Sequence, residues 1–124
     1  MPERDVSSEE AVALIIFEAS ESVESLLTIV RRGEDPGAER MGHLSLALKT
    51  VFQAFEGNPE LERNLAAALF TLGSDVPLTI SSLAGRGHSW RRGFMEDEVY
   101  QLLMGVQSIF EDRWLEPEQP DTIH

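Results

Sequence analysis

The chain contains no cysteine among its 124 residues. Disulfides, thiolate metal sites and cysteine nucleophiles are therefore excluded. Long apolar runs are missing as well: the longest covers only residues 11–17, whereas a membrane-spanning helix needs about 20 apolar residues. The first ten residues are polar and acidic, unlike a secretory signal, which has a basic start and then an apolar stretch. We therefore expect a cytoplasmic protein that does not bind a membrane.

Basic side chains are scarce. Ten Lys and Arg residues stand against 22 Asp and Glu residues, which gives a net charge of −12. Such a charge keeps a protein soluble and repels nucleic acids and anionic membranes at long range. The length of 124 residues and the hydrophobic content of 42% suit a single globular domain with one core. The composition predicts an acidic domain for which nucleic acid is an unfavourable partner.

No segment alternates between apolar and polar residues with a period of two, so that no strand is predicted. Apolar residues instead recur every three or four positions, which is typical of amphipathic helices. Glycine and proline breaks and a capping box at Ser7 and Glu10 delimit the predicted helices. These helices cover residues 7–32, 38–56, 59–72, 76–84 and 94–114. Gly105 lies inside the last of them and predicts the close approach of a neighbouring element.

The short links between these helices favour antiparallel neighbours. We therefore expect an all-α, single-domain bundle of four long helices and one short helix, the segment 76–84. The domain should cover residues 7–114. Residues 1–6 should form a flexible leader, and residues 115–124, which are acidic and contain two prolines, a disordered tail.

Patterns that carry enzyme or metal chemistry are weak. Glu39 and His43 have a spacing that brings two ligands together on one helix, but a di-iron bundle needs Glu-x-x-His pairs on two helices. His88 and Ser89 are adjacent in the sequence, but the third, orienting group of a catalytic triad is missing. We expect no metal site, no cofactor and no enzymatic activity.

Residues 85–94, with the sequence GRGHSWRRGF, form a basic segment in an acidic chain. The segment has three arginines, no acidic residue, and three glycines that separate it from the apolar periodicity on both sides. Its mixture of aromatic residues and arginine is typical of interface hot spots. Two interpretations of Trp90 stay open, a partner contact or a lid folded back onto the core. The residues predicted to contact an acidic or phosphorylated partner protein are Arg86, His88, Trp90, Arg91, Arg92 and Phe94. Replacing Arg91 and Arg92 by alanine should leave the fold intact and abolish partner capture.

The first predicted helix is apolar on all sides over residues 12–17, so that it must be buried on more than one side. Such a surplus suits an isologous homodimer or contact with another protein. A helix central to its own bundle would explain the pattern equally well. The candidate dimer or partner residues are Val12, Ile15, Ile16 and Phe17.

These features favour a non-enzymatic protein that acts through protein–protein contact, such as a regulator, an adaptor or a chaperone-like factor, and that forms a homodimer. An alternative is a DNA-binding regulator with a helix-turn-helix over residues 65–84 and Gly73 in the turn. However, its second helix would lack Arg, Lys, Asn and Gln to read bases. A third possibility is an acidic inhibitor that mimics nucleic acid by its charge.

Overall fold

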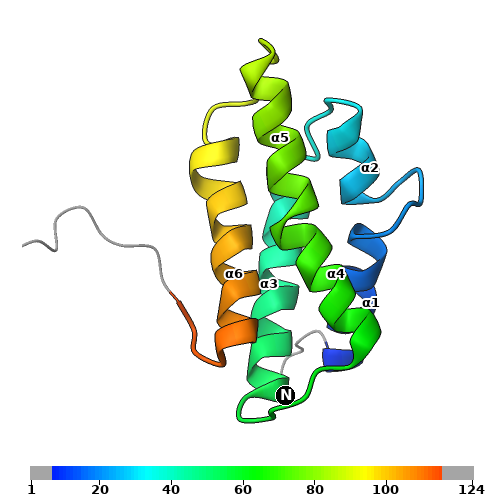
Figure 1. Cartoon of the computed structure of the whole chain (residues 1–124), viewed down its shortest axis with the longest axis vertical. Helices are drawn as coiled ribbons and strands as arrows, with labels where there is room; N and C mark the ends of the chain where they lie inside the picture. The colour runs from blue at the N-terminus through cyan, green and yellow to red at the C-terminus, as the bar shows by residue number, and fades with distance from the viewer. Residues whose placement is uncertain (1–6, 116–124) are drawn as a thin grey trace, which may run out of the picture.

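The computed structural model describes residues 7–115, which form an all-α fold without a β-strand (Figure 1). The prediction of an all-α fold is therefore confirmed. The predicted leader lies outside the described residues, as does the predicted tail apart from Leu115. The elements are α1 (Ser8–Glu18), α2 (Leu26–Arg31), α3 (Ala38–Phe55), α4 (Arg63–Gly73), α5 (Asp75–Gly85), a π-helical segment η1 (Phe94–Val99) and α6 (Tyr100–Glu111).

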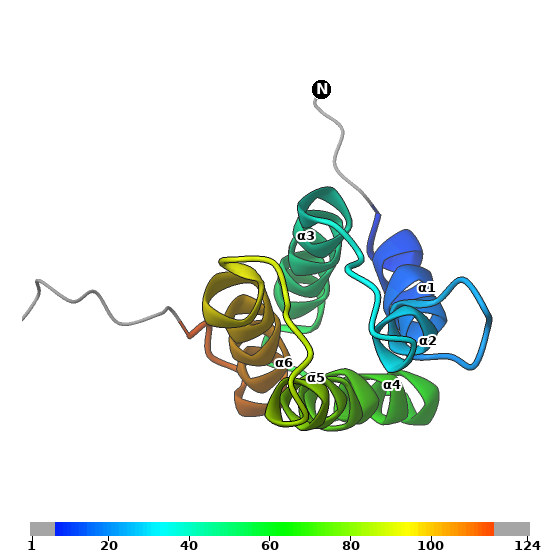
Figure 2. The same ribbon diagram turned by 90° about the horizontal axis from the view of Figure 1, so that it is seen from above.

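Four helices surround the core. Viewed along the bundle, α3, α1, α4 and α6 occupy successive corners of a ring (Figure 2). Helix α2 sits above α1 and packs against α5, which continues the line of α4 (Figure 1). Large side chains from all four corners are fully buried between them, including Ile15, Leu44, Leu48, Leu65, Leu69 and Leu102.

The prediction of one continuous helix over residues 7–32 is wrong, because α1 ends at Glu18 and α2 begins at Leu26. The serines of the intervening segment compete with the helix for backbone hydrogen bonds. The Ser20 hydroxyl donates to a carbonyl in the last turn of α1, and Ser25 caps the start of α2. Val23, which fits the apolar stripe by spacing, lies in solvent. The spacing of three and four persists across the break, so that periodicity alone does not reveal it.

Helices α4 and α5 form one rod with a break at Ser74 (Figure 1). Pro77 explains the break, since a proline has no N–H group and its ring conflicts with the carbonyl four residues earlier, here that of Gly73. The predicted short helix is therefore as long as α4, and the helix predicted from residue 59 begins only at Arg63. A helix-turn-helix joins helices at about 90–120° through three or four residues. That predicted arrangement is wrong, because a single residue joins two helices that run on in nearly one direction.

Two helical glycines allow close packing of α6. A Cβ atom added at Gly105 would lie 3.0 Å from the Leu48 Cδ1 atom of α3, which confirms the predicted close approach. A Cβ atom at Gly73 of α4 would lie 3.0 Å from the Val106 Cγ1 atom of α6. Helix α6 ends three residues before the predicted limit of 114. There, Asp112 adopts a positive φ of 57° and accepts a hydrogen bond from the Gly57 N–H group.

Candidate interaction surfaces

The link between α5 and η1, which makes up most of the predicted basic loop, is bonded to the link between α2 and α3. Arg91 donates from Nε to the Asp35 carboxylate at 2.6 Å and from Nη2 to the Glu98 carboxylate at 2.7 Å. These bonds raise the pKa of Arg91, and the hydrogen bond from Arg91 lowers the pKa of Asp35. Two carboxylates therefore neutralise the Arg91 guanidinium group. The structure assigns Arg91 to holding two links together, so that its replacement is expected to weaken the fold.

The aromatic residues of the same loop face inward. The Trp90 indole N–H group donates to the Ile80 carbonyl at 3.1 Å, and its ring packs 5.1 Å from that of Phe94. Phe94 is fully buried. His88 stacks edge-on against Trp90 and lies over Gly33, where an added Cβ atom would be 3.0 Å from the imidazole. Trp90 is therefore a lid on the core, and the prediction that Phe94 contacts a partner is wrong.

All three arginines of the loop are exposed, but only Arg91 pairs with carboxylates among residues 7–115. Arg86 donates to the Ser82 hydroxyl one turn earlier on α5. Arg92 has no hydrogen bond or ion pair with any other residue between 7 and 115. Of the six predicted contact residues, Arg86 and Arg92 are therefore the exposed arginines that no carboxylate between residues 7 and 115 neutralises.

Residues 12–17 of α1 are apolar on all sides. The packing of α3 on one side of the helix and of α4 on the other explains this pattern. Ile15 is fully buried, and Val12 and Ile16 pack against the core as partly buried residues. Of the predicted dimer or partner surface on this helix, Ile15 is thus internal, and Val12 and Ile16 are partly covered by the protein's own core. Only Phe17 of the four predicted residues is classed as exposed, and it lies in a groove between α1 and α3.

The α1–α3 groove has a volume of about 940 Å³, and its lining combines apolar and charged side chains. Phe17 of α1 and Leu46 of α3 contribute apolar surface. Glu39 and His43, the pair with metal-ligand spacing, lie on the α3 wall. Among residues 7–115, no group of three or more His, Asp or Glu side chains is placed to hold a metal ion.

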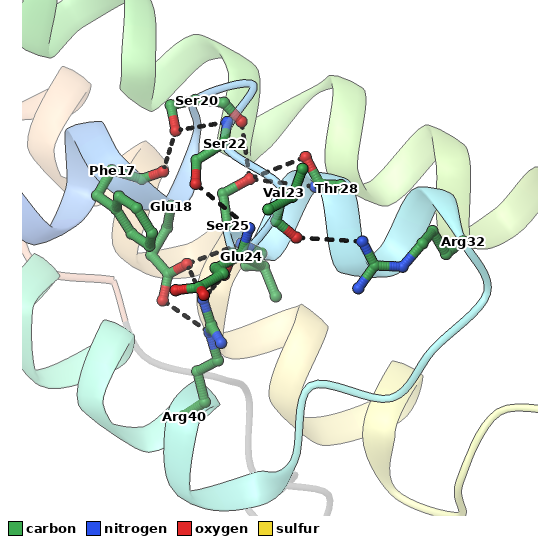
Figure 3. Close-up of polar contacts among 11 residues, drawn as sticks. Phe17, Glu18, Ser20, Ser22, Val23, Glu24, Ser25, Thr28, Arg32 and Arg40 are labelled. Atoms are coloured by element: carbon green, nitrogen blue, oxygen red, sulfur yellow. Dashed lines mark hydrogen bonds and ion pairs between the residues drawn. The ribbon is translucent and has the colours of Figure 1, made fainter.

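A buried ion pair forms part of this groove. The Glu18 side chain is only 4% exposed and accepts three hydrogen bonds, from the Leu26 N–H group at 2.7 Å and from Arg40 Nη2 and Nε at 2.7 and 2.9 Å (Figure 3). Arg40 also donates to the Glu24 carbonyl. The pair thus connects α3 to the end of α1 and the start of α2. Within the described part of the chain, every buried side-chain nitrogen and oxygen has a hydrogen-bond partner.

A second groove, between α4 and α6, has a different character. It has a volume of about 370 Å³, and its lining is mostly apolar. Phe70 of α4 is 64% exposed and Phe110 of α6 is 49% exposed, although both are large hydrophobic residues. The rest of the wall that α6 contributes is formed by Tyr100, Leu103, Met104, Val106 and Gln107. Sequence reasoning did not identify this surface.

The two segments that build the α4–α6 groove are almost free of charge. Residues 64–85 contain one charged side chain, Asp75, and residues 99–110 contain none, although the chain has 32 Asp, Glu, Lys and Arg residues in total (22 acidic and 10 basic). The rod Arg63–Gly85 is long and apolar enough to cross a membrane by length and composition alone, a criterion that core helices of soluble proteins also meet. Only 33% of its most apolar window is buried, so that apolar surface remains outside. This local absence of charge is the sequence signal that points to the groove.

No family model, curated protein or solved structure matches this chain.

Proposed function

We propose that this chain is a non-enzymatic interaction protein, a regulator or adaptor, that binds a protein partner through the α4–α6 groove. The observation that carries the proposal is the exposure of Phe70 and Phe110 on an uncharged face of a protein whose net charge is −12. Scattered apolar residues on a surface need no explanation, but contiguous apolar patches often mark interaction sites.

The side chains around the groove have the composition of an interface centre. Aromatic residues and methionine are enriched at protein interfaces, and charged residues are depleted at their cores. Phe70, Tyr100 and Phe110 supply the aromatic surface, and Met104 supplies a side chain that adapts to the shape of what it contacts. Partner helices bind such grooves through apolar side chains on one face.

The groove replaces the two surfaces expected from the sequence. The loop 85–94 directs Trp90 and Phe94 into the core, and α1 lies between two neighbours. A nucleic acid is a poor partner for the groove, because its lining offers no cation to contact phosphates.

Affinity capture from a cell extract tests the proposal with three forms of the tagged chain: wild type, Phe70→Glu and Leu46→Glu. Leu46 is 54% exposed in the α1–α3 groove, so that its replacement introduces the same charge at a similarly exposed site. We expect a protein that co-purifies with the wild type and with Leu46→Glu but is lost with Phe70→Glu.

Circular dichroism should first establish that both variants retain the helical content of the wild type. Partners that Phe70→Glu retains as well as the wild type does would refute the proposal. Loss of the partner with both variants would also contradict it, since that result would not depend on the groove.

A further inference from the structure

We propose that the α4–α6 groove is filled by the same groove of a second copy of this chain, which makes the protein a two-fold homodimer. The inference rests on the proposed function and specifies the partner. It places the homodimer expected from the sequence on α4 and α6 instead of on α1, which is already packed between α3 and α4.

The face carries both a well-exposed aromatic side chain and a recess. Phe70 is the more exposed of the two phenylalanines, and it lines a cavity of about 370 Å³ between its own helix and α6. A two-fold interface uses one patch twice and must therefore be complementary to itself. If two copies meet with this face, each Phe70 enters the groove of the other copy, where Tyr100 and Phe110 line the α6 wall.

The distribution of charge selects this face for self-association. Two copies with a net charge of −12 repel each other, and like charges placed opposite one another across an interface weaken binding. The segments 64–85 and 99–110 bring a single carboxylate, that of Asp75. Two copies can approach through this face without opposing carboxylates in the groove itself.

The α1–α3 groove does not offer the same possibility. Three carboxylates, those of Glu18, Glu24 and Glu39, line it against one guanidinium group, that of Arg40. Two copies that met there would bring these carboxylates together. A basic heterologous partner would suit that lining, whereas it would find no charge to pair with in the lining of the α4–α6 groove.

The salt dependence of binding distinguishes a second copy of this chain from a basic partner. The Debye length falls from about 8 Å at 0.15 M to about 3 Å at 1 M ionic strength, so that added salt screens the repulsion between two acidic copies. The dimer should therefore become tighter as salt is added. A complex with a basic protein should become weaker.

Sedimentation equilibrium of the full chain tests the inference, over a range of protein concentrations at low and at high salt. The average mass of the wild type should rise from 13.8 kDa toward twice that value as the protein concentration increases. In high salt this rise should occur at lower protein concentrations. Phe70→Glu should raise the dissociation constant by more than about tenfold, as expected for a central aromatic anchor. Leu46→Glu should behave like the wild type.

Three results would overturn the inference: a wild type that stays monomeric at every concentration, a dimer that Phe70→Glu leaves unchanged, and a dimer that salt dissociates. The proposed function is tested separately from the dimer. If the wild type is monomeric but captures another protein in a Phe70-dependent way, the second copy is the wrong occupant and the groove remains the binding site. If capture is also independent of Phe70, both proposals fail.

Discussion

The helix pairs α1–α3 and α4–α6 lie on opposite sides of the four-helix ring (Figure 2). The grooves that they form have opposite chemistry. The larger groove contains the Glu18–Arg40 pair, whose hydrogen bonds join three helices. The smaller groove is apolar and exposes aromatic rings. The larger volume of the α1–α3 groove does not by itself indicate a binding site, because its Glu18–Arg40 pair is already used to hold the fold together.

The contrast also follows from the positions of the helix breaks. The interruption between α1 and α2 leaves backbone N–H groups at the start of α2 without helical partners, and the Glu18 carboxylate accepts a hydrogen bond from one of them. The break at Ser74 needs no such repair, because it is only one residue long. The α4–α5 rod carries only two charged side chains, those of Arg63 and Asp75.

Removal of the guanidinium group from the α1–α3 groove should have the largest effect. Arg40→Ala leaves the Glu18 carboxylate buried with the Leu26 N–H group as its remaining partner. We expect a loss of about 3 kcal/mol in the free energy of unfolding, the lower end for a broken buried pair because Arg40 itself is partly exposed. Urea denaturation measures this loss.

A suitable control is Arg31→Ala, which breaks an exposed pair with Glu21 and should cost less than about 1 kcal/mol. Equal effects of the two substitutions would mean that the α1–α3 groove does not hold the fold together as described.

Two glycine-to-alanine substitutions should change the free energy of unfolding in opposite directions. In the wall of the α4–α6 groove, Gly73→Ala forces Val106 to move, and we expect a net destabilisation of about 1 kcal/mol after the gain in helix propensity. Gly42→Ala on α3 meets no atom within 4 Å and should stabilise by about 0.5–1 kcal/mol. Thermal and urea unfolding of both variants measure these changes. A stabilised Gly73→Ala variant would show that α4 and α6 are less closely packed than described.

The clamp between the two links should depend on pH. Arg91 holds the pKa of Asp35 below its ordinary value of 3.8, so that the stabilisation is fully present above that value and is lost as pH falls through the lowered pKa. We therefore expect Arg91→Ala to lower the urea midpoint at pH 7, by less than Arg40→Ala does because the clamp is more exposed. The difference from the wild type should shrink below pH 4.

For this pH series Arg92→Ala is the matched control, since Arg92 has no partner between residues 7 and 115 and its removal should leave the midpoint unchanged at every pH. A difference between wild type and Arg91→Ala that stays constant down to pH 2 would exclude Asp35 as the titrating partner.

The smallest effect on stability should come from the exposed apolar residues that differ most in the proposed role. Phe70→Glu and Leu46→Glu should each change the free energy of unfolding of the monomer by no more than about 0.5 kcal/mol. Denaturation in dilute solution measures this, because dimerisation contributes to apparent stability at higher concentration. A large loss for Phe70→Glu in dilute solution would identify Phe70 as part of the core and not of a binding face.

Local patterns in the sequence were sufficient for much of the fold. The predicted helix 38–56 differs from α3 by one residue, and Gly105 marks the approach of α3. The break before α2 could not be predicted from apolar spacing, because Val23 continues the stripe although it lies in solvent. It depends on serine hydrogen bonds, which spacing does not register.

The candidate site was less accessible from the sequence, because it depends on contacts between distant segments. The carboxylate that engages Arg91 belongs to Asp35, 56 positions earlier, so that the basic loop appears free when only its own residues are considered. Trp90 likewise finds its hydrogen-bond acceptor on α5. The α4–α6 groove exists only where two helices lie side by side, although the absence of charge over residues 64–85 and 99–110 was readable beforehand.

The separation of 56 positions between Arg91 and Asp35 also has a kinetic consequence. The contact closes a long loop of chain and requires that both links be in place, so that we expect it to form after the helices have packed. An interaction that is absent from the folding transition state acts on the unfolding rate and not on the folding rate. We therefore expect Arg91→Ala to speed unfolding while leaving the folding rate unchanged.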